Sequence, residues 1–228
     1  TSIALLKWWF GREHLIPKAD GSVFNFRYYF AQREAVEAVI YLYDVVQAKD
    51  KYDLIRFDAS GAVSAGMFDE DWLRLVLKMA TGSGKTKVMS LLLAWCYFHK
   101  LYEANSRLAR NFLVIAPNII VLDRIRHDFD GLKIFHDDPI LPDIGYEGQN
   151  WKDDFQLTLH IQDEVRVTHP VGNIFLIEPL QIRQADRLEF IDSQDDFGQH
   201  SRRHAGRLEE AAGRRMADAP RRGDRVPL

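Results

Sequence analysis

The segment Ala80–Thr86 constrains the fold more than any other part of the chain, and it reads Ala-Thr-Gly-Ser-Gly-Lys-Thr. It follows the short apolar run Leu73–Leu77 and precedes Lys87–Tyr102, which is apolar almost throughout. The first run predicts a strand that is covered on both faces, and the second predicts a helix buried beside a sheet. A strand, a glycine-rich turn and a helix in this order predict a phosphate-binding loop, or P-loop, rather than an accidental glycine-rich turn.

The residue types of this loop match the chemistry of a nucleoside triphosphate. Gly82 and Gly84 let the backbone turn toward phosphates, and the helix that begins near Lys85 directs its N–H groups and dipole at their negative charge. Lys85 is expected to bridge the β and γ phosphates, and the Thr86 hydroxyl is expected to ligate Mg²⁺. The predicted nucleotide-binding residues of the loop are Thr81, Gly82, Ser83, Gly84, Lys85 and Thr86.

The rest of the chain up to residue 180 alternates between helical and strand patterns. Helices are predicted at 2–10, 32–46 and 118–129, strands at 111–116, 156–161 and 173–177, and turns at 17–25 and 60–66. Strands alternating with helices require crossover connections, so we expect an α/β fold with helices on a mostly parallel sheet. The strand at 111–116 is expected to be buried.

The composition changes beyond residue 180. All ten lysines lie at or before Lys152, whereas ten of the twenty arginines follow Leu180. Residues 181–228 also lack periodic apolar positions, so a mostly unfolded tail is expected there. A frameshift or premature end that replaced the native sequence is one hypothesis for this tail, and a natural solvated tail is the alternative.

Several classes of protein are disfavoured. The longest apolar run, Val88–Phe98, is far shorter than the roughly 20 residues of a membrane span, and the opening residues do not form a secretory leader. Cys96 is the only cysteine, so an internal disulfide is impossible and a packing role is expected. These features predict a cytoplasmic protein.

Three segments resemble superfamily-2 helicases. Met79–Thr86 is similar to their motif I, in which the first position need not be glycine, and Phe26–Val36 resembles the aromatic and glutamine segment that they place against adenine. Phe112–Asn118 is similar to motif Ia. In this order the segments resemble the first motor domain of the type III restriction enzyme Res subunits, a RecA-like P-loop domain.

This resemblance implies specific roles. Gln32 is expected to contact the base of ATP, and Pro117 and Asn118 are expected to contact the nucleic-acid backbone. Mg²⁺ and ATP would be the cofactors, DNA a partner, and restriction-modification subunits further partners. The implied organisation is an N-terminal helix and linker at 1–25, a partial motor domain at 26–180 and the tail at 181–228.

The sequence leaves hydrolysis open, because an aspartate-glutamate pair after an apolar strand normally completes the magnesium site. Asp163-Glu164 is the later candidate, but an ordinary strand end or hairpin also fits it. The chain therefore reads as the N-terminal part of a DNA-dependent ATPase, as a remnant that binds nucleotide without turnover, or, least favoured, as a small-molecule phosphotransferase. His200 and His204 lack a third metal ligand, and Asp69–Asp71 fits a solvated approach to a strand.

Overall fold

The computed structural model describes residues 1–18, 20–58, 60–62, 64, 66, 73–161 and 167–178. The expected tail, the pair Asp163-Glu164, the histidines at 200 and 204 and the acidic run at 69–71 lie outside these residues. The domain boundary at residue 180 therefore stays a prediction.

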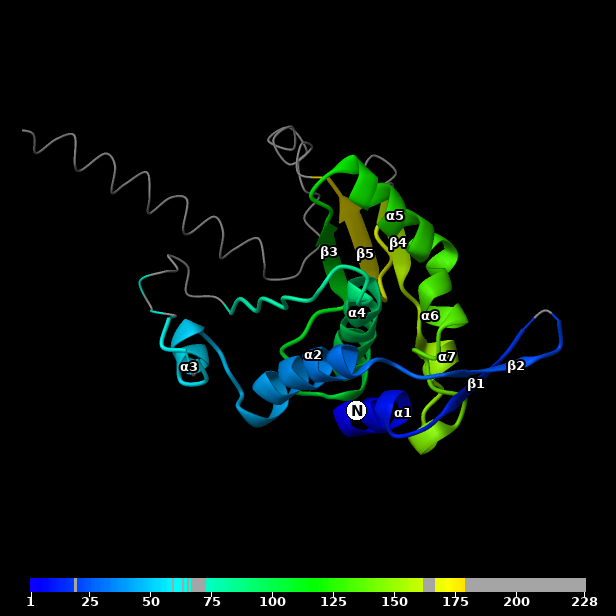
Figure 1. Ribbon diagram of the computed structural model, residues 1–228, viewed down its shortest axis with the longest axis horizontal. Coiled ribbons are helices and arrows are strands. Elements are labelled where there is room, and N and C mark those ends of the chain that lie inside the picture. The colour runs from blue at the N-terminus through cyan, green and yellow to red at the C-terminus, as the bar shows by residue number, and fades with distance from the viewer. Residues whose placement is uncertain are drawn as a thin grey trace, which may run out of the picture. The chain divides into compact units, whose positions relative to one another are not determined.

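A three-stranded parallel sheet forms the centre of the fold and confirms the predicted α/β class (Figure 1). Its strands are β3 (Asn111–Ile115), β4 (Thr158–Ile161) and β5 (Asn173–Ile177), in the order β3-β5-β4. Leu113 lies opposite Phe175, which lies opposite His160. β3 and β4 lie on opposite sides of β5, and the long connection between these two parallel strands contains further helices.

Helices before and between the strands flank this sheet (Figure 1). The helices on the N-terminal side are α1 (Ser2–Phe10), α2 (Phe30–Ile40), the π-helix η1 (Tyr41–Val45), α3 (Lys51–Ile55) and α4 (Lys85–Tyr102). Between β3 and β4 come α5 (Ile119–Phe129), the 3₁₀ turn η3 (Asp130–Leu132), α6 (Lys133–Asp137), the 3₁₀ turn η4 (Tyr146–Gly148) and α7 (Trp151–Asp154). The predicted helices at 2–10 and 118–129 are confirmed, and that at 32–46 is realised as α2 followed by η1.

The core is built around α4, as its apolar sequence predicts. Trp95, Tyr97 and Phe98 are each at most 2% exposed, and Phe98 meets Trp151 with 4.9 Å between ring centroids. The polar atoms of these rings find partners inside the fold, since Trp95 Nε1 donates to Ser2 Oγ at 2.8 Å. Buried aromatic groups with satisfied polar atoms fix α4 rigidly beneath the loop that precedes it.

The prediction of a covered strand at Leu73–Leu77 is wrong. These residues have no regular secondary structure and pair with neither described sheet, and the Val76 side chain is 88% exposed. An apolar run becomes a buried strand only where neighbouring strands offer free backbone groups and covering layers. Within the described residues, Leu73–Leu77 has neither.

Two further expectations need correction. The strand at 111–116 was expected to be buried, but its residues alternate, with Val114 buried and Leu113 and Ile115 58% and 48% exposed. The turn-rich segment at 17–25 contains the turn of an antiparallel hairpin formed by β1 (His14–Pro17) and β2 (Val23–Phe26). Short, exposed strands carry little periodic signal, so the sequence showed only the turn.

Candidate nucleotide-binding site

The predicted P-loop connects the extended segment at 73–80 to the first turn of α4. Gly82 and Gly84 have φ angles of 79° and 82°, which lie in the left-handed region that favours glycine. Gly84 is the N-cap of α4, and Lys85 is its first residue, as predicted. In the described part of the chain no side chain caps this helix end, so its first N–H groups remain available to an anion.

The two residues expected to carry the chemistry lie in this first turn. The Lys85 ammonium donates to the carbonyl oxygens of Met79 and Ala80, at 3.0 and 2.9 Å, and is exposed. The Thr86 carbonyl accepts a hydrogen bond from Ser90 Oγ at 2.9 Å, whereas the Thr86 hydroxyl has no partner among the described groups. An exposed lysine of this loop suits the charge of a phosphate, and a hydroxyl without a described partner suits a magnesium ion.

Gln32 lies directly against the loop, although 51 residues separate it from Ser83. Its Nε2 donates to the Ser83 carbonyl at 3.1 Å, its Oε1 accepts from the Tyr29 N–H at 2.9 Å, and its side chain is 2% exposed. Both ends of the amide are therefore bonded to backbone. The structure brings Gln32 to the predicted site as a brace of the P-loop, and its contact with a base stays a prediction.

The exposed aromatic rings next to Gln32 are Tyr29 and Phe30, at 69% and 74% exposure. They lie at the start of α2, where Tyr29 is the N-cap. Large exposed rings beside a phosphate-binding loop provide flat apolar surface on which a base can stack. The sequence pattern of aromatic residues before a glutamine indicated this surface.

Lys87 belongs to the same turn but was not singled out from the sequence. Its ammonium pairs with the Asp138 carboxylate and lies 5.1 Å from the centroid of the Phe26 ring. The pair joins the start of α4 to the segment after α6. No local pattern could reveal it, because the partners are 51 residues apart and neither belongs to a motif.

Pro117 and Asn118 follow β3 and are exposed, at the point where α5 begins. Asn118 Oδ1 accepts a hydrogen bond from the Val121 N–H at 3.0 Å, so its side chain serves as the helix N-cap. Beside it, Ile119 and Ile120 are 50% and 64% exposed. The expected contact of Pro117 and Asn118 with nucleic acid stays a prediction.

The structure also bears on the cysteine, on metal ligands and on membrane-spanning helices. Burial raises the pKa of the Cys96 thiol to about 12, which agrees with a packing role. Within the described ranges, no three His, Cys, Asp or Glu side chains lie close enough together to hold a metal ion. None of the helices that the structure describes is long and apolar enough to cross a bilayer.

One comparison with known proteins gives a match. The family model described as "Type III restriction enzyme, res subunit" matches residues 24–190. This range includes the segment before Gln32, the P-loop and the end of β3. No curated protein and no solved structure matches the chain.

Proposed function

The chain belongs to the type III restriction enzyme res subunit family, a family of superfamily-2 helicase motor domains, and on this premise we propose that it binds ATP through Thr81–Thr86. We further propose that it is the N-terminal motor domain of a DNA-dependent ATPase of the restriction type. The geometry of the loop carries the proposal. Two left-handed glycines turn the backbone into an uncapped helix N-terminus, with Lys85 at its mouth.

Each group of the loop has a distinct task in this proposal. The N–H groups at the start of α4 bind phosphate oxygens, and Lys85 exchanges the carbonyls of Met79 and Ala80 for the terminal phosphates. The uncommitted Thr86 hydroxyl is the ligand offered to Mg²⁺, which neutralises charge on the phosphates when bound. Gln32 donates a hydrogen bond to the Ser83 carbonyl, and its side-chain amide is the proposed contact to the base.

DNA is the proposed macromolecular partner. The family points to nucleic-acid interaction in general, and Pro117 and Asn118 are the proposed backbone contacts. Restriction-modification subunits and a cytoplasmic location complete the proposal. Because Asn118 Oδ1 accepts the capping hydrogen bond, its side-chain contact with a phosphate would be donated by Nδ2 to a phosphate oxygen.

A second function remains in competition: an ATP-binding module without turnover. It is favoured by the weak fit of Asp163-Glu164 to the acidic motif, since the strand before it alternates polar and apolar residues. Both functions need the P-loop, but only the motor needs a carboxylate that orients the attacking water.

ATP affinity and ATP turnover separate the two functions. Lys85→Ala should abolish measurable binding of a fluorescent ATP analogue in the presence of Mg²⁺, because the main cation at the phosphates is lost. Lys133→Ala removes the same charge from the exposed surface of α6 and is the matched control. Equal affinity in Lys85→Ala and Lys133→Ala would rule out the P-loop assignment.

The second measurement is steady-state ATP hydrolysis with and without DNA. A rate that rises with added DNA and disappears in Lys85→Ala supports the motor. Tight binding of ATP with no hydrolysis in either condition supports the binding module.

A further inference from the structure

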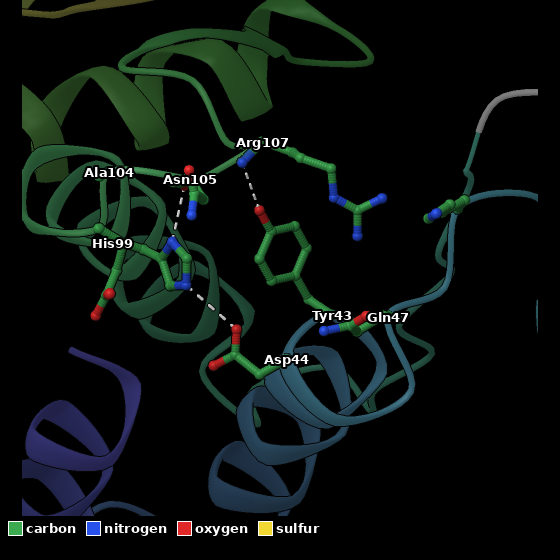
Figure 2. Close-up of a pocket in the computed structure, with 10 residues that line it drawn as sticks. Tyr43, Asp44, Gln47, His99, Ala104, Asn105 and Arg107 are labelled. Carbon is green, nitrogen blue, oxygen red and sulfur yellow. Dashed lines mark hydrogen bonds and ion pairs between the residues drawn. The ribbon is translucent and has the colours of Figure 1, made fainter.

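A cavity lies at the opposite end of α4 from the P-loop, with a volume of about 450 Å³ (Figure 2). Its lining residues are Tyr43, Asp44, Gln47, Lys49, His99 and Glu103–Arg107, and we call it the Arg107 pocket. His99 follows Lys85 by 14 residues on the same helix. At the rise of an α-helix this is about 21 Å, so the pocket and the P-loop are separate.

A buried histidine fixes the wall of the Arg107 pocket. His99 is 9% exposed, and its Nε2 lies 3.2 Å from Asp44 Oδ1 while its Nδ1 lies 2.8 Å from Ser106 Oγ (Figure 2). The Leu108 N–H donates a further hydrogen bond to Ser106 Oγ. The network joins η1 to the loop after α4, so the two sides of the pocket are held at a set separation.

The backbone on the η1 side departs from ordinary helix geometry. Residues 41–45 form a π-helix, and Gln47 just beyond it has a φ angle of 55°. π-Helical turns and left-handed residues other than glycine are costly and gather at functional sites. Here they turn Tyr43, Asp44 and Gln47 toward the pocket (Figure 2).

The acidic and basic side chains of the Arg107 pocket differ in whether they have direct partners. Both carboxylates have partners. Asp44 Oδ1 lies 3.2 Å from His99 Nε2, and Glu103 Oε1 accepts hydrogen bonds from the Thr1 amino group at 2.9 Å and the Thr1 hydroxyl at 2.7 Å. Lys49 and Arg107 form no ion pair with any described residue. Lys49 and Arg107 are therefore the charged groups of the pocket that no described carboxylate contacts directly, whereas both carboxylates already have partners.

Tyr43 contacts both the side chain and the backbone of Arg107. Its guanidinium lies 5.2 Å from the centroid of the Tyr43 ring, and its backbone N–H donates to Tyr43 Oη at 2.8 Å. Figure 2 shows the guanidinium extended past Tyr43, and Arg107 is exposed. A guanidinium fixed on an aromatic face presents its planar fork, and that fork matches a phosphate oxygen pair.

We propose that the Arg107 pocket is a second anion site, which binds a phosphate group through Arg107 and Lys49. The side-chain amides of Gln47 and Asn105 supply further donors at its edge. The phosphate is either a small phosphate ester or a phosphate of a nucleic-acid strand. The site does not depend on the P-loop or on ATP.

NMR titration of the 228-residue chain tests the site directly. The ¹⁵N-labelled chain carries Lys85→Ala to weaken the P-loop, and inorganic phosphate is the probe. The backbone amides of residues 103–107 should shift and give a dissociation constant. Arg107→Ala should raise that constant at least about tenfold, because a charge-assisted pair is lost.

Arg124→Ala is the matched control, since Arg124 is an exposed arginine of α5 outside the pocket. It should leave the constant unchanged, and Lys49→Ala should raise it. A short single-stranded oligonucleotide separates the sources: amide shifts with both probes identify a strand phosphate, and shifts with inorganic phosphate alone identify a small ester. The proposal is overturned by unshifted 103–107 amides with both probes, or by equal constants in Arg107→Ala and Arg124→Ala.

Discussion

Replacing Gly84 by alanine tests whether Gln32 braces the P-loop. Gly84 has a φ angle of 82°, so any side chain there carries left-handed strain of about 1–2 kcal/mol. An added Cβ would also overlap Gln32 Nε2, far inside van der Waals contact. Gln32 is buried and bonded at both ends, so its amide cannot move without losing both hydrogen bonds.

The magnitude follows from these two costs. Each hydrogen bond of Gln32 contributes about 1 kcal/mol net, so displacement of the amide adds about 2 kcal/mol to the strain. We expect Gly84→Ala to reduce the free energy of unfolding by about 3–4 kcal/mol. Gly82→Ala is the matched control, because its φ angle is 79° and an added Cβ there meets nothing within 4 Å. It should cost only the strain of about 1–2 kcal/mol.

Urea denaturation of four variants supplies the answer: Gly82→Ala, Gly84→Ala, Gln32→Ala and the double variant at 32 and 84. Without the Gln32 amide, the remaining neighbour of the added Cβ is Lys87 Cβ at 4.0 Å, an ordinary contact. The excess cost of Gly84→Ala over Gly82→Ala should therefore vanish in the Gln32→Ala background. Equal costs at both glycines, or an excess that persists without Gln32, would refute the brace.

Three other predictions concern single groups. Burial is the main cause that lowers the pKa of His14 below its ordinary 6.5, so the folded state favours the neutral ring. The contribution of His14 to the free energy of unfolding should be fully present above pH 6.5 and fall as the pH drops toward the folded-state pKa. Urea midpoints measured against pH should lose this part of the pH dependence in His14→Gln. Cys96, with its pKa raised to about 12 by burial, should resist alkylation in the native chain at pH 7.5 and react after denaturation, as intact mass would show; rapid native labelling would contradict its burial. Asn118→Ala removes the cap bond to the Val121 N–H and should cost about 1 kcal/mol in urea denaturation, whereas Asn118→Asp, which keeps an accepting oxygen, should cost little.

Part of the candidate site could be predicted because its signals are local. Gly82, Gly84 and Lys85 lie within four consecutive residues, and their conformation and charge depend on their own types. The pairing of Lys87 with Asp138 could not be predicted, because residues far apart in sequence meet only after α4 and the segment beyond α6 have packed.

The sequence by itself determined the glycine-rich loop before α4, the buried helix α4 and the α/β class, since glycine placement and apolar periodicity act over a few residues. Only the tertiary structure decided that Leu73–Leu77 joins neither sheet of the described residues, because a strand forms through hydrogen bonds to its neighbours. It alone brought Gln32 to Ser83, and His99 to Asp44 and Ser106. Such polar contacts form where separate elements pack together, and the residue type at one position does not indicate which distant residue it will contact.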